Sequence, residues 1–122
     1  MSRFEEQVAN DAEAINNAVL LRTLRQVLDA PYFHVLPKET WIASLGALIK
    51  VRLYATLKSN NEFQQRMGIF WQAGETEENR SSIKAYYREF ITNIALGVVL
   101  DTIRLHHPQF HFQELDNDFQ SS

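Results

Sequence analysis

No charged side chain interrupts the run Phe90-Ile-Thr-Asn-Ile-Ala-Leu-Gly-Val-Val-Leu100, which lies between Glu89 and Asp101. The run is too short to cross a bilayer, which takes about 20 apolar residues. It is also too apolar on every side for a helix that keeps one face in water. We therefore expect either the rest of the chain or a second copy of it to cover this run.

One long helix is predicted around this run. Thr76 is a typical N-cap, and the acidic pair Glu77-Glu78 suits the positive end of a helix dipole. The helix should end at His106-His107, because Pro108 follows. Some 30 residues would span roughly 45 Å, more than the width of a compact domain of this size. We therefore expect it to project into a second subunit or to break near Ser81-Ser82. Its predicted apolar face comprises Ile83, Tyr86, Tyr87, Phe90, Ile91, Ile94, Ala95, Val98, Val99 and Leu105.

The N-terminal part also has helical periodicity. Ser2 and Glu5 fit a capping box, and apolar residues then recur every three or four positions from Phe4 to Leu28. This helix should end near Asp29, because Pro31 cannot continue it. The following segment, 31–37, is rich in aromatic residues and is expected to pack against the core.

The middle of the chain allows two interpretations. Residues 38–58 have apolar side chains at helical spacing, and a third helix capped by Asn61 would end at Gly74. Residues 49–57 also alternate between apolar and polar, which is typical of a strand. The favoured fold is an all-α, four-helix bundle-like single domain over residues 1–112, followed by a flexible acidic tail, 113–122. The alternative is an α+β fold with a hairpin at 49–57 and 67–73.

Composition sets broad limits on function. The 122 residues form one domain by the usual size prior, with a net charge of -3 and no cysteine. Disulfide scaffolds, thiolate zinc sites and cysteine nucleophiles are thereby excluded. The N-terminus lacks an apolar signal core, so a cytoplasmic location with no membrane association is expected.

No catalytic, cofactor or metal site is predicted. The serines lie in no nucleophile motif, the glycines form no phosphate-binding loop, and adjacent carboxylates diverge on a helix.

His106, His107 and His111 lie close together in sequence, but Pro108 removes any common face for them. We interpret the first two as helix-end histidines, where positive charge is favoured. The alternative is a metal site in a small metal-dependent enzyme. His34 is expected in the core or at its rim.

Two surfaces are candidates for partner binding. Residues 38–66 have a net charge of +3, whereas residues 101–122 have -3. Lys50, Tyr54 and Lys58 share one helix face, and with Arg52 they would meet an acidic protein, phosphates or only solvent. Ala43, Gly46 and Ala47 form a small-residue patch beside them. The second surface is aromatic: Trp71, Tyr86 and Tyr87 are either binding residues or core.

These observations favour a non-catalytic protein–protein interaction module, such as an adaptor, inhibitor, chaperone or accessory subunit. It would act through a helical surface on another protein and would form a homodimer or higher homo-oligomer. The complementary charges of the middle and the C-terminal region would favour such self-association. The alternative is a nucleic-acid-associated regulator that uses the basic 38–66 region, which the acidic net charge disfavours.

Overall fold

The computed structural model describes residues 2–30 and 37–108, and within them it contains four helices and no strand. The helices are α1 (Arg3–Asp29), α2 (Lys38–Ser59), α3 (Asn61–Gln72) and α4 (Glu77–His106). The predicted all-α fold is therefore confirmed. Predictions for the segment 31–36, for His34 and His111, and for the tail 113–122 lie outside the described residues.

The alternative hairpin at 49–57 and 67–73 is wrong. Residues 49–57 belong to α2, where Leu45, Ile49, Leu53 and Leu57 recur every four positions and are all buried. A strand would have placed Val51 on the same side as Ile49 and Leu53. In the helix Val51 instead faces outward, with 68% of its surface exposed. Burial of one complete helical face therefore outweighed the local alternation.

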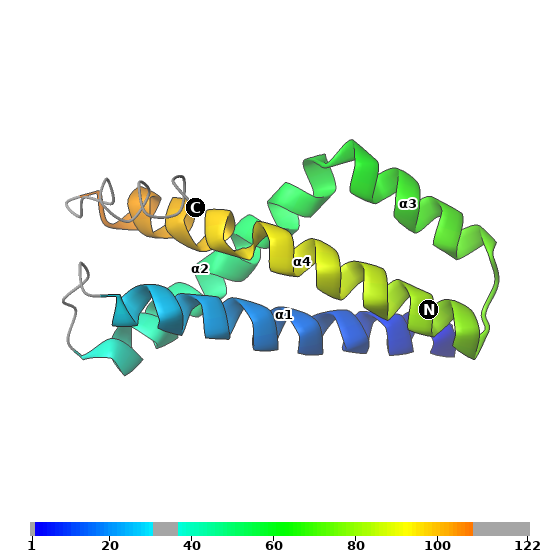
Figure 1. Cartoon of the computed structure of the whole chain (residues 1–122), viewed down its shortest axis with the longest axis horizontal. Helices are drawn as coiled ribbons and strands as arrows, with labels where there is room; N and C mark the ends of the chain where they lie inside the picture. Colours follow the sequence, from blue (N-terminus) through cyan, green and yellow to red (C-terminus); the bar gives the residue numbers. More distant parts are fainter. Residues whose placement is uncertain (1, 31–36, 109–122) are drawn as a thin grey trace.

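The two longest helices, α1 and α4, lie side by side and run in the same direction along the long axis of the molecule (Figure 1). Two contacts define their register. Asp11 pairs with Arg80, and further along Asn16 pairs with Tyr87. The predicted break near Ser81-Ser82 is wrong, because α4 is continuous from Glu77 to His106 and α1 accompanies it. Projection of the helix end into a second subunit stays a prediction. The molecule is elongated, so a long helix fits within one chain.

The uncharged run of α4 is covered by the chain itself. Ile91, Ala95 and Val99 are at most 1% exposed, and the exposed residues of the run are Thr92, Asn93 and Gly97. The run therefore requires no second copy to shield it. The predicted apolar face of α4 is otherwise close to the observed one, except for Leu105, which is 61% exposed.

α2 crosses the α1–α4 pair and closes one side of the core (Figure 1). Its buried leucines and isoleucine meet apolar side chains from both long helices. Burying each such side chain contributes about 1.5–3 kcal/mol. The innermost apolar residues, each at most 1% exposed, are Leu24, Leu28, Leu45, Ile49, Leu53, Ile91, Ala95, Val99 and Ile103.

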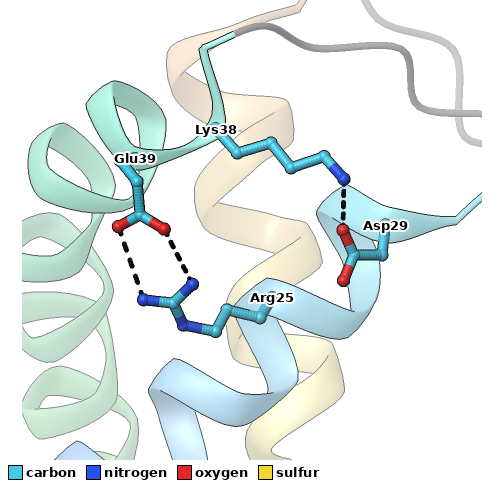
Figure 2. A network of polar contacts seen from close by, with 4 residues as sticks. All are labelled: Arg25, Asp29, Lys38 and Glu39. Carbon is cyan, nitrogen blue, oxygen red and sulfur yellow. Dashed lines mark hydrogen bonds and ion pairs between the residues drawn. The ribbon is translucent and has the colours of Figure 1, made fainter.

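The junction between α1 and α2 is held by surface ion pairs (Figure 2). The guanidinium of Arg25 donates to both carboxylate oxygens of Glu39, over 2.8 and 3.4 Å, and Lys38 pairs with Asp29. These side chains are largely exposed, so each pair contributes only about 0–1 kcal/mol. They orient the start of α2 on the end of α1 more than they stabilise the fold.

Local chemistry sets the remaining helix boundaries. Ser2 and Thr76 accept backbone hydrogen bonds from Glu5 and Asn79, so both predicted N-caps are confirmed. The predicted cap of α3 is wrong by one position: Asn60 has the extended backbone, and its side chain accepts from the N–H of Phe63 at 2.8 Å. Beyond the end of α3, Gly74 has a φ of 102°, which favours glycine.

α3 is the most loosely held helix. It projects from the other three before the chain returns to the start of α4 (Figure 1). Phe63, near its first turn, is the one buried residue among those of α3. At the other end Asn79 donates two hydrogen bonds, both of 2.8 Å, to the carbonyls of Phe70 and Gly74. The two ends of α3 are therefore better anchored than its middle.

Candidate functional site

Glu13 of α1 connects two of the predicted partner-binding residues to the body of the protein. Its carboxylate accepts hydrogen bonds from Lys50 Nζ at 2.9 Å and from the hydroxyl of Tyr54 at 3.0 Å. Both donors come from α2, on the helix face that the sequence predicts to be basic. The charge of Lys50 is therefore compensated inside the chain, and less of it is available to a partner.

This contact continues into the core as a chain of side-chain hydrogen bonds. The Tyr54 hydroxyl accepts from Asn16 Nδ2 at 3.3 Å, and Asn16 Oδ1 accepts from the hydroxyl of Tyr87 at 2.8 Å. Asn16 is completely buried, and it connects α1 with both α2 and α4. Among the described residues no buried side-chain nitrogen or oxygen lacks a hydrogen-bond partner. The network therefore satisfies its own polar atoms.

The electrostatics of this network stabilise its present protonation states. The hydrogen bonds from Lys50 and then Tyr54 lower the pKa of Glu13, against a smaller opposing effect of burial. Burial, followed by the hydrogen bond to Glu13, raises the pKa of Tyr54. Burial raises the pKa of Tyr87 to about 12. At neutral pH both tyrosines are protonated and Glu13 is charged, so the network supplies neither a phenolate nucleophile nor a general base poised near pH 7.

Beside this network an apolar groove lies open between α1 and α2. We call it the α1–α2 groove; it has a volume of about 150 Å³ and is lined by Asn16, Asn17, Leu20, Leu21, Leu24, Gly46, Ile49 and Lys50. Leu21 lies on its wall with 39% of its surface exposed. A Cβ atom added to Gly46 would meet no atom within 4 Å, so the groove is open above this residue.

The predicted small-residue patch borders the α1–α2 groove. Gly46 lines it, and Ala43 and Ala47 are exposed on the adjoining surface of α2. Val51 extends this apolar surface by one further turn. Leu21 completes it from α1 and could not be assigned from the sequence, because the pair Leu20-Leu21 does not show which leucine faces the core.

The other predicted basic residues are spread out. Arg52 and Lys58 are exposed on α2, with no ion pair to any residue that the structure describes. Arg66 of α3 lies over the ring of Tyr86, 5.6 Å from its centroid. The structure therefore does not gather the cations of 38–66 into one patch.

The predicted aromatic surface is divided between core and solvent. Tyr87 is buried, and Tyr86 is half-buried between the rings of Phe63 and Phe70. Trp71 is 45% exposed and contacts the ring of Phe4 edge-on, with centroids 6.1 Å apart. Of the three predicted residues, Trp71 is thus the most accessible to a partner.

The helix-end position predicted for two histidines is confirmed. His106 is the last residue of α4, and His107 caps it and packs against Trp41 with ring centroids 4.3 Å apart. Within residues 2–30 and 37–108, no group of three histidine, aspartate or glutamate side chains is arranged to hold a metal ion. None of the described helices is both long and apolar enough to cross a membrane.

Comparison of the chain with protein-family models, with curated proteins and with solved structures found no match.

Proposed function

We propose that the chain is a non-catalytic protein-interaction module that binds another protein through the α1–α2 groove. Adaptors, inhibitors, chaperones and accessory subunits act in this way. The observation that carries the proposal is the open apolar surface at Leu21 and Gly46, continued on α2 by Ala43, Ala47 and Val51. Exposed apolar surface next to a preformed groove favours docking of an apolar ridge from a partner helix.

The polar network below the groove supports a binding role. Because Glu13 and Lys50 neutralise each other, the rim of the groove has little net charge at this point. Asn16 and Tyr54 hold α1 and α2 at a defined separation, which keeps the groove preformed. A preformed site costs less ordering entropy on binding than one that must be organised by the partner. A second copy of this chain is one candidate partner, and its solution molar mass tests that case.

The alternative role in nucleic-acid binding has less support. Of the cations in 38–66, Lys38 and Lys50 are paired with carboxylates, and Arg66 lies over an aromatic ring. Within residues 38–66, no observation favours phosphate binding over protein docking.

The decisive experiment fills the groove without removing any contact. Gly46→Leu places a side chain in the open space, whereas Gly97→Leu adds the same side chain at an exposed position of α4 outside the groove. Proteins cross-linked to the chain in native extract are identified for both variants and for the natural sequence. A partner shared by the natural protein and Gly97→Leu but lost from Gly46→Leu supports the proposal. The absence of any partner, or full retention by Gly46→Leu, contradicts it.

A further inference from the structure

A second groove runs along the seam between α1 and α4, on a different side of α1. We call it the α1–α4 groove; three overlapping pockets that share Val19 form it, the largest with a volume of about 370 Å³. Ala18 and Arg22 of α1 line this groove, whereas the neighbouring residues Asn17 and Leu21 line the α1–α2 groove. The contacts available to α1 are thus divided between two separate surfaces.

The floor of the α1–α4 groove is small and partly apolar. Ala14, Ala18 and Thr92 are exposed along it, and Val19 and Leu96 lie below them. Small side chains keep the groove open over most of the length of α1. From Asp11 to Ala30 this length is about 28 Å at 1.5 Å per residue. The groove can therefore hold an extended segment of roughly eight or nine residues.

The walls of the groove carry positive charge that the described residues do not neutralise. Arg22 on α1 and Lys84 and Arg88 on α4 are all exposed lining residues. Neither arginine forms an ion pair with a residue that the structure describes. Lys84 attracts the carboxylate of Asp11 electrostatically but forms no ion pair with it. Asp11 is the one carboxylate among the lining residues, and Arg80 binds both of its oxygens, over 2.8 and 3.1 Å. In a chain of net charge -3, this groove is therefore a local concentration of positive charge, which would attract an acidic sequence.

We propose that the α1–α4 groove binds the acidic C-terminal sequence 113–122 of the same chain. This sequence contains Glu114, Asp116 and Asp118, with the apolar residues Leu115 and Phe119 among them. Three carboxylates thus match the three uncompensated cations of the walls. The proposal concerns a surface separate from the α1–α2 groove and does not depend on the function proposed above.

Chain length permits this contact within one molecule. Arg88 lies 18 residues before His106, which corresponds to about 27 Å along α4. Asp116 lies 10 residues after His106, and so many residues reach at most about 33–36 Å. The same comparison allows Asp118 to reach Lys84. Intramolecular binding also has the advantage of a high effective concentration, which a second molecule lacks.

The test uses the full chain with its three carboxylates neutralised, Glu114→Gln/Asp116→Asn/Asp118→Asn. Backbone amide NMR shifts of Ala14, Ala18 and Thr92 should differ from those of the natural chain, while Ala43 and Ala47 on α2 should not change. Adding a synthetic peptide of residues 109–122 to the neutralised chain should restore the groove shifts. Raising the salt concentration to about 1 M, where the Debye length is about 3 Å, should weaken the binding of the peptide to the neutralised chain.

Matched charge reversals locate the contact. Arg88→Glu in the neutralised chain should weaken peptide binding about tenfold. Lys58→Glu makes an equal charge change at an exposed position of α2 and should alter peptide binding less than twofold. Circular dichroism confirms that both variants fold, and Arg88→Gln replaces Arg88→Glu if that variant does not. Unchanged groove shifts after neutralisation would overturn the proposal. Differences from the neutralised chain that disappear on dilution would also overturn it, because they would assign the contact to a second copy.

Discussion

Asn16 is the residue on which three helices converge. Its side chain is fully buried, and it both donates to Tyr54 and accepts from Tyr87. A buried amide that lost either partner would retain an unsatisfied polar atom, which costs about 1–3 kcal/mol. Alternative packings of α1 against α2 and α4 that separate these residues are disfavoured to this extent. Asn16 thus contributes to the specificity of the fold.

Tyr87→Phe should lower the free energy of unfolding by about 1–3 kcal/mol, because Asn16 Oδ1 would lose its donor inside the core. Tyr86→Phe is the matched control. Tyr86 is half-buried, and its hydroxyl makes no hydrogen bond to a described residue, so we expect a change below about 0.5 kcal/mol. Urea titration measures the free energy of unfolding of both variants, and the m-value should stay unchanged. Equal effects of the two substitutions would contradict the role assigned to Asn16.

Asp11 should make the stability of the fold depend on pH in the acidic range. The hydrogen bond from Arg80 lowers the pKa of Asp11 from its ordinary value of 3.8. A carboxylate whose pKa is lower in the folded state stabilises the fold above the unfolded-state pKa and loses this effect as pH falls through the folded-state value. Stability of the natural chain should therefore decrease below about pH 4 more steeply than that of Asp11→Asn. Thermal unfolding followed between about pH 2 and 6 tests this, and parallel curves for the two proteins would contradict it.

Two glycines show how position in an element decides the sign of one substitution. Gly46 lies inside α2 with open space around it, so Gly46→Ala should stabilise the protein by about 0.5–1 kcal/mol. Gly74 has a φ of 102°, which an alanine side chain strains, so Gly74→Ala should destabilise it by about 1–2 kcal/mol. Shifts of the thermal midpoint in opposite directions would agree with both. A midpoint unchanged or raised in Gly74→Ala would show that the turn before α4 tolerates another conformation.

The element boundaries were predictable because their signals are local. Ser2 and Thr76 cap the helices that follow them, and Gly74 adopts the backbone expected for it, from chemistry within three or four residues. The candidate sites were less predictable. Lys50 finds Glu13 at a separation of 37 residues, and no local pattern indicates which carboxylate a surface lysine will meet. The α1–α4 groove was missed for the same reason, since Arg22 and Arg88 become neighbours only when α1 and α4 pack.

At the scale of the whole molecule, stability should be uneven. α1, α2 and α4 share the core, whereas α3 contributes a single buried side chain among its residues, Phe63. We expect the amides of α3 to exchange with solvent by local opening, well before those of α1 and α4. Hydrogen exchange followed by mass spectrometry measures this order. Equal protection of α3 and α4 would mean that α3 opens only with the whole molecule.

The parallel pairing of α1 with α4 also has a consequence for biosynthesis. The residues that meet across this pair are 69 and 71 positions apart in the chain, as in Arg80 with Asp11 and Tyr87 with Asn16. The ribosome synthesises about 5–20 residues per second, so the nascent chain must expose the apolar face of α1 for several seconds before α4 is complete. Such delayed closure slows folding relative to bundles built from neighbouring helices. In the cell, a chaperone that recognises apolar helices would have time to bind this first helix before its last partner is translated.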